Sequence, residues 1–151
     1  MFHLIPAPLH RMALRLGHGL RKRWWRWRKP LLIGCSVMLF DGQGRVLLVR
    51  HSYGHGLWGL PGGAVGRGED PAAAAQRELR EEIGCGADAL TPCGSVTRDF
   101  HGARNQVHMF RAVTDDMPRP DGREIVTAEF FALDALPADL SEGAAYWLKR
   151  G

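Results

Sequence analysis

One short segment in the middle of the sequence is delimited more sharply than any other. Asp70 can cap a helix with its carboxylate, and Pro71 fits the first helical position, where its missing amide would have no partner anyway. Gly84 fits the position just past the end, where a left-handed backbone closes a helix. These signals predict a helix over residues 71–83, bounded at both ends by its own sequence.

The rest of the chain alternates apolar segments with turns. Its 151 residues suit one domain, and 45% apolar residues are enough to bury a core. Strands are predicted over Leu31–Phe40, Arg45–Arg50, Leu57–Leu60, Ala89–Phe100, Val107–Val113 and Thr127–Ala132, with a second helix over Ser141–Lys149. Residues 41–44 are expected to form a turn, and residues 114–123 a loop. Mixed strands flanked by two helices indicate an α/β or α+β sandwich.

Three glutamates, Glu78, Glu81 and Glu82, fall within an arc of about 100° on the predicted helix. Such like charges repel by roughly 0.2–0.5 kcal/mol for each i,i+4 pair. A solvated acidic face would explain the cluster, but not its position after a Pro-Gly-Gly turn and a glycine-rich loop. Carboxylates are preferred ligands of Mg²⁺, and glycines let the backbone approach metal and phosphates closely. The segment therefore predicts a Mg²⁺ site for phosphate chemistry, with a glutamate taking a proton from water.

The same segment resembles the Nudix box, whose pattern is G-x5-E-x7-R-E-U-x-E-E-x-G-U with U a bulky apolar residue. Every fixed position is matched, and Cys85 is a small choice for the last apolar one. The matching residues are Gly63, Glu69, Arg77-Glu78-Leu79, Glu81-Glu82, Gly84 and Cys85. Seven fixed identities at set spacing make this a specific signal. The resemblance covers about residues 31–140 and implies a Nudix-type α/β/α sandwich with a mixed sheet.

The resemblance also implies roles for individual residues. Glu78 and Glu82 would be direct Mg²⁺ ligands, and Glu81 would help to bind metal or handle the attacking water; Mn²⁺ can substitute. A backbone carbonyl near Gly62 or Gly63 would complete the metal shell. The remaining candidates are Arg77 paired with Glu69 in a structural role, Glu124 as a further ligand or base with Glu129 behind it, and Arg50 as a phosphate contact.

Charge divides the chain into two parts. Residues 1–30 hold eight basic residues and no acidic one, so the remaining 121 residues hold 12 basic and 16 acidic groups. The net charge of +4 is thus the sum of a +8 segment and a −4 body, which excludes a uniformly basic protein that coats nucleic acid. We expect residues 1–29 to be a basic amphipathic arm and residues 30–151 to be the Nudix domain.

The arm carries an apolar stripe at helical spacing, with tryptophans among its basic residues. It could pack on the domain or on a second copy in a homodimer, or residues 9–29 could contact an anionic membrane surface or RNA.

The three cysteines form neither a disulfide framework nor a zinc motif. With no signal peptide or transmembrane segment evident, we expect a cytoplasmic protein, peripheral at the membrane if the arm binds lipid.

Three functional hypotheses follow. The leading one is a Mg²⁺-dependent Nudix hydrolase that cleaves a diphosphate bond in a nucleoside diphosphate linked to another moiety. The second is a Nudix-fold module that binds a nucleotide without turnover, which the intact glutamate set argues against. The third is an enzyme delivered by its basic arm to a membrane or to RNA. The box does not define the nucleotide, so the substrate class stays open at this point.

Overall fold

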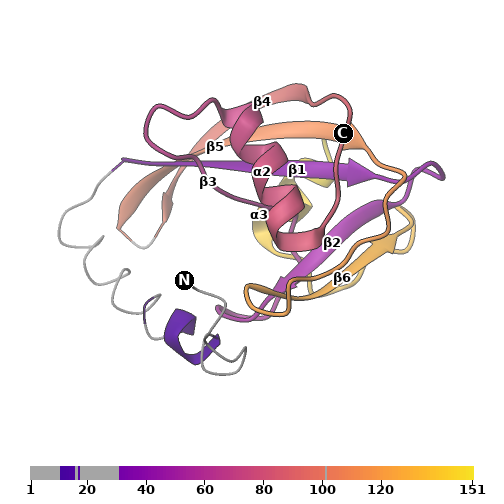
Figure 1. Ribbon diagram of the computed structural model, residues 1–151, viewed down its shortest axis with the longest axis horizontal. Coiled ribbons are helices and arrows are strands. Elements are labelled where there is room, and N and C mark those ends of the chain that lie inside the picture. The colour runs from indigo at the N-terminus through magenta and orange to yellow at the C-terminus, as the bar shows by residue number, and fades with distance from the viewer. Residues whose placement is uncertain (1–10, 16, 18–30, 101) are drawn as a thin grey trace.

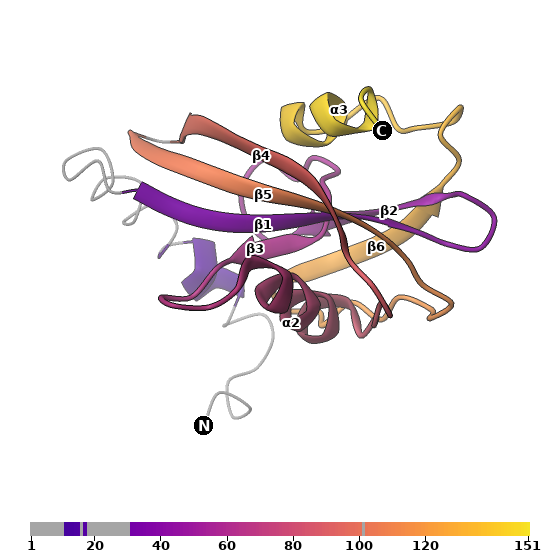
Figure 2. The ribbon, with the colours of Figure 1, turned by 90° about the horizontal axis from the view of Figure 1, so that it is seen from above.

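The computed structural model describes residues 11–15, 17, 31–100 and 102–151. They form one six-stranded sheet with a helix against each face, as Figures 1 and 2 show. The strands are β1 (Leu31–Phe40), β2 (Val46–His51), β3 (Gly62–Ala64), β4 (Thr91–Phe100), β5 (Ala103–Val113) and β6 (Ile125–Phe131). The helices are α2 (Pro71–Ile83) and α3 (Glu142–Leu148). This is the expected α+β sandwich.

The sheet is mixed. Its order is β4-β5-β1-β2-β6, with β3 paired to β1 off this path. Strands β1 and β5 run parallel over their shared length, whereas every other pairing is antiparallel. The two strands of this parallel pair lie in the middle of the sheet, and the chain between them includes α2, which crosses one face of the sheet (Figure 2).

Both faces of the central strands are covered, which explains why β1 reads as a nearly continuous apolar run. Alternate residues Val37 and Leu39 lie in the core under α2, whereas Met38 and Phe40 lie in the core on the other side. Figure 2 shows α2 and α3 on opposite sides of the sheet. The structure thus has three layers, with two separate hydrophobic clusters.

The strand predicted over Leu57–Leu60 is wrong in its position. Trp58 and Gly59 make only isolated bridges, and the strand lies later, at β3, where it pairs with the start of β1. Gly62 permits this pairing, since its φ is 153° and a Cβ there would lie 2.1 Å from the carbonyl oxygen of Cys35. Only glycine tolerates such an approach, so the Pro-Gly-Gly segment continues as a strand against β1.

The predicted arm lies mostly outside the described residues. Residues 11–15 and 17 are helical, as predicted, but Met12 and Ala13 of the predicted apolar stripe are exposed, and the rest of the predicted helix lies outside the described residues. None of the helices in the described part of the chain combines the length and apolar character needed to cross a membrane.

Candidate active site

Helix α2 begins and ends where its sequence predicts. The side chain of Asp70 accepts a hydrogen bond of 3.1 Å from the amide of Ala73, and Gly84 has the left-handed φ of 64°. Leu79 and Ile83 are fully buried against the sheet. This buried stripe fixes the rotation of α2 about its axis, and so fixes the side on which its glutamates lie.

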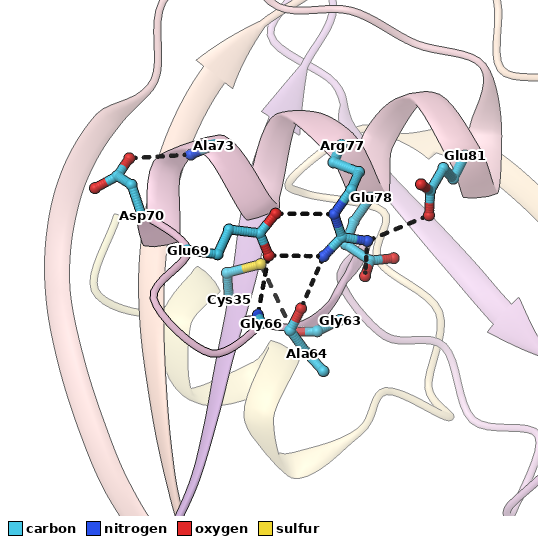
Figure 3. Close-up of polar contacts among 10 residues, drawn as sticks. All are labelled: Cys35, Gly63, Ala64, Gly66, Glu69, Asp70, Ala73, Arg77, Glu78 and Glu81. Atoms are coloured by element: carbon cyan, nitrogen blue, oxygen red, sulfur yellow. Dashed lines mark hydrogen bonds and ion pairs between the residues drawn. The ribbon is translucent and has the colours of Figure 1, made fainter.

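Arg77 joins the glycine-rich loop to α2, as Figure 3 shows. Its Nε and Nη2 each donate to a carboxylate oxygen of Glu69 at 3.0 Å, and Nη2 also donates to the carbonyl of Ala64 at 3.1 Å. Glu69 further accepts from the amide of Gly66 at 2.9 Å. Hydrogen bonds from Arg77 and Gly66 lower the pKa of Glu69 to about 2. The loop before α2 is therefore tied to the helix by a charged, two-pronged contact.

The same guanidinium reaches two of the proposed metal-binding carboxylates. Its Nη1 donates to Glu78 at 2.9 Å and to Glu81 at 3.3 Å (Figure 3). Glu78 is largely buried, with 12% of its side chain exposed, whereas the side chain of Glu81 is 60% exposed. A single nitrogen of Arg77 thus orients both the buried carboxylate of Glu78 and the exposed carboxylate of Glu81.

Glu82 is the most deeply placed of the three glutamates on α2, with only 4% of its surface exposed. The amide of Gly62 donates to its carboxylate, while Oε2 is buried with no hydrogen-bond partner among the described residues. Burial, followed by the negative charges of Glu78, Glu124 and Asp121, raises the pKa of Glu82 to about 9. A cation bound in this position would offset these negative charges.

Glu124 is brought to this cluster by the loop that precedes β6. The amide of Asp121 donates to the carbonyl of Glu82 at 2.9 Å, so the loop is bonded directly to the last turn of α2. The carbonyl of Glu124 accepts from the amide of Ser52 at 2.8 Å. A residue predicted from the family pattern therefore lies beside the helix glutamates, although it is far from them in the sequence.

Asp121 is a site residue that the sequence interpretation missed. Its Oδ1 accepts from three successive amides, those of residues 123, 124 and 125, at 3.0, 3.1 and 2.9 Å. An aspartate followed by glycine is a common sign of such a turn, and this signal was present in the predicted loop. Asp121 shapes the turn that carries Glu124.

These side chains surround a cavity of about 360 Å³, which we call the acidic pocket. It is lined by Leu14, Glu78, Glu81, Glu82, Asp121, Arg123 and Glu124. Five of these seven residues are acidic. A larger hollow of about 560 Å³ beside the β1–β2 turn contains none of the box residues and includes Glu129. The three glutamates of α2 therefore line the acidic pocket, and Glu129 lies away from it.

The acidic pocket fits a hard divalent cation in its donor set. Among the described residues, no three Asp, Glu, His or Cys side chains already form a metal-holding group, and Glu78 and Glu81 instead bond to Arg77. The unpartnered oxygen of Glu82 and the surrounding carboxylates nevertheless match the oxygen ligands that Mg²⁺ prefers.

Gly63 approaches this site with its Cα. A Cβ there would lie 2.5 Å from the carboxyl carbon of Glu78, so only glycine leaves room for that side chain. The carbonyl oxygen of Gly63 accepts a weak contact of 3.6 Å from the thiol of Cys35. Because a carbonyl oxygen has two lone pairs, this contact leaves the predicted metal contact of Gly63 open.

Arg50, the predicted phosphate contact, is engaged elsewhere. Its guanidinium pairs with Asp139 and lies 4.5 Å from the centre of the Trp58 ring. It is absent from the described lining of the acidic pocket. The structure therefore brings together Glu78, Glu81, Glu82 and Glu124 but not Arg50.

Comparison with known proteins agrees with this geometry. The family model for the NUDIX domain matches residues 30–151, so the chain belongs to the Nudix family. It is 37% identical over 117 residues to the oxidized purine nucleoside triphosphate hydrolase of Mus musculus, covering 74% of this chain and 73% of that protein. It is also 40% identical over 55 residues to the RNA pyrophosphohydrolase of Rhodospirillum rubrum, covering 36% of this chain and 33% of that protein.

Solved structures show the same fold. The MutT NUDIX hydrolase from Burkholderia pseudomallei superposes with a TM-score of 0.72 at 28% identity, covering 79% of this chain and 96% of that one. The MutT protein of Methanosarcina mazei Go1 gives a TM-score of 0.73 at 22% identity, covering 81% of this chain and 93% of that one. The protein is a Nudix hydrolase, and enzymes of this family generally use a divalent metal ion.

Proposed function

We propose that this enzyme hydrolyses the diphosphate linkage of purine nucleoside triphosphates with Mg²⁺ as its metal. A nucleoside triphosphate is a nucleoside diphosphate linked to a further phosphate, which is the substrate class implied by the box. The observation that carries the proposal is the buried, unpartnered oxygen of Glu82 in a pocket of five carboxylates. The choice of nucleotide is supported by the relatives from Mus musculus and Danio rerio, both named oxidized purine nucleoside triphosphate hydrolases.

The buried and the exposed carboxylates of the pocket would have different roles in the reaction. Glu82 and Glu78 lie deepest and would hold the metal, with the backbone carbonyl of Gly63, a residue packed closely against Glu78, as a further ligand. Bound Mg²⁺ would neutralise phosphate charge and acidify a water molecule. The exposed Glu81 or the loop residue Glu124, which line the same pocket, would take a proton from that water. Arg77 keeps Glu78 and Glu81 oriented throughout.

A substrate panel tests the proposal. Purified protein with Mg²⁺ is incubated with dGTP, 8-oxo-dGTP, dATP, ADP-ribose, 5′-triphosphorylated RNA and isopentenyl diphosphate, and the products are separated. The last compound is included because a relative from Streptomyces griseus, 33% identical over 106 residues, is named isopentenyl-diphosphate Delta-isomerase. We expect the purine triphosphates to be turned over most efficiently, with Mn²⁺ able to replace Mg²⁺.

Matched variants connect turnover to the site. Glu82→Gln should lower the rate by about 10²-fold or more, because metal binding and proton transfer both depend on this cluster. Glu142→Gln is the control, since Glu142 is exposed on α3 across the sheet from α2 (Figure 2). Tight nucleotide binding with no product in either metal would instead identify a binding module. Conversion of isopentenyl diphosphate alone would replace hydrolysis with isomerisation.

The role of the whole arm is a separate proposal. Contact of residues 9–29 with an anionic membrane surface or RNA is supported by their charge and tryptophan content, and a homodimer by their apolar stripe. A cytoplasmic location is supported by three cysteines that form no disulfide framework. Co-sedimentation with liposomes or RNA at two salt concentrations tests the contact, because electrostatic binding must weaken with salt.

A further inference from the structure

The short helical segment of residues 11–15, which we call the N-terminal cap, lies against the acidic pocket. Nε of Arg11 donates to the carbonyl of Gly122 at 2.6 Å, and Nε of Arg15 donates to the carbonyl of Ser52 at 2.8 Å. Figure 1 shows the cap, in indigo, beside the end of β2 and the loop that leads into β6. These two hydrogen bonds hold the cap against the domain.

Both arginines of the cap are connected by hydrogen bonds to the loop that carries Glu124, Arg11 directly and Arg15 through Ser52. Gly122, which accepts from Arg11, follows Asp121 in that loop. Ser52 accepts from Arg15 through its carbonyl and donates through its amide to the carbonyl of Glu124. The cap, the end of β2 and the loop therefore form one hydrogen-bonded unit next to the catalytic carboxylates.

Leu14, between the two arginines, lines the acidic pocket itself. It is the one apolar side chain among the described residues of that lining, where the others are five acids and Arg123. An apolar wall cannot hydrogen-bond phosphate oxygens, and burying charge against it would be unfavourable. A ligand group in contact with Leu14 would therefore be the apolar face of a base or sugar.

We propose that the N-terminal cap is part of the substrate site of this enzyme, outside the conserved box. Leu14 is a specificity-determining residue that contacts the nucleoside, whereas Arg11 and Arg15 are positioning residues that hold the Glu124 loop. The proposal rests on the proposed function, because it assumes a nucleotide in the acidic pocket. The proposal goes beyond the proposed function because it assigns a role to residues 11–15, which lie outside the region matched by the family model.

Leu14→Ala tests the contact with the nucleoside. We expect the KM for dGTP to rise about fivefold to tenfold, in line with the loss of two or so buried methyl or methylene groups. The inhibition constant of inorganic tripolyphosphate, which has no nucleoside, should not change. Leu14→Met should restore most of the affinity. Met12→Ala is the matched control, since Met12 lies on the same turn but is 55% exposed and does not line the pocket.

Two results would overturn the role of Leu14. One is an unchanged KM for dGTP in Leu14→Ala. The other is an equal weakening of dGTP and tripolyphosphate, which would mean that the substitution disturbs the phosphate and metal region. The affinity of the α,β-imido analogue of dGTP, measured by calorimetry, gives the same comparison without turnover.

Arg11→Gln and Arg15→Gln test the positioning role. We expect faster hydrogen exchange at the amides of residues 122–124 and a several-fold lower kcat, with the KM changed less. Lys149→Gln, which removes one exposed positive charge at the end of α3, is the control and should change neither. Unchanged exchange in both arginine variants would overturn the role. Absence of turnover in the unmodified enzyme would contradict the proposed function alone, because the exchange measurement does not depend on it.

Discussion

Arg77 holds Glu69 through two parallel hydrogen bonds of 3.0 Å, one to each carboxylate oxygen. This pair predicts a pH dependence of stability. Since Arg77 holds the pKa of Glu69 at about 2, the ionised form is favoured in the folded state relative to the unfolded one. The stabilisation is fully present above the ordinary pKa of glutamate, about 4.3, and is lost as the pH falls from there toward 2.

Thermal unfolding of Glu69→Gln, compared with the unmodified protein between pH 7 and pH 2.5, measures this effect. We expect the variant to have the lower Tm at pH 7, and the two values to converge as the pH approaches 2.5. Glu142→Gln, whose carboxylate is exposed on α3, should show no such convergence. A Tm difference for Glu69→Gln that stays constant over the whole range would contradict the assignment.

The close approach of Gly63 to Glu78 makes a second prediction. In Gly63→Ala the new Cβ would lie 2.5 Å from the carboxyl carbon of Glu78, which must then turn away from the acidic pocket. We expect Mg²⁺-dependent turnover to fall by about 10²-fold, the size of effect typical of a misplaced catalytic group. Gly42→Ala is the control because a Cβ there meets nothing within 4 Å. Full activity in Gly63→Ala would show that Glu78 does not need its present position.

The local part of the site could be predicted from the sequence. The bounds of α2 follow from Asp70, Pro71 and Gly84, whose effects act within one turn of the helix. The glutamates of α2 lie together because helical periodicity alone places them on one side. Strand β1 was also predicted with its observed bounds, since a long apolar run between turn residues is a strong signal.

What the sequence did not predict depends on contacts between distant segments. Asp121 and Ser52 act through backbone hydrogen bonds to α2 and to the Glu124 loop, and no local pattern marks such partners. Leu14 was not part of the apolar stripe predicted for the arm, yet it lines the pocket among acidic neighbours. The strand expected over Leu57–Leu60 was misplaced because its position depends on the fit of Gly62 against β1.

The three amides bonded to Asp121 make a third prediction. Asp121→Ala leaves the amides of residues 123, 124 and 125 without their acceptor, which costs about 1 kcal/mol because most of these hydrogen bonds are exposed to solvent. We expect a lower Tm and a lower kcat, since the turn that carries Glu124 loosens. Asp121→Asn keeps a carbonyl oxygen and should recover most of the stability. Asp115→Ala, at an exposed position earlier in the same loop, should leave both quantities unchanged. Equal stability of the two Asp121 variants would argue against the turn.

The buried carboxylate of Glu82 makes the last prediction, which concerns metal binding without turnover. In the absence of a cation, Glu82 must either carry a buried charge beside Glu78 and Glu124 or remain protonated. Glu82→Gln removes this conflict, so the metal-free variant should unfold at a Tm at least as high as that of the unmodified protein. Mg²⁺ at 100 times its Kd should stabilise the unmodified protein by about 2.7 kcal/mol but should not stabilise the variant. Glu129→Gln, which lies outside the acidic pocket, should keep the full response to Mg²⁺. The same rise in Tm with Mg²⁺ in Glu82→Gln would place the metal away from this carboxylate.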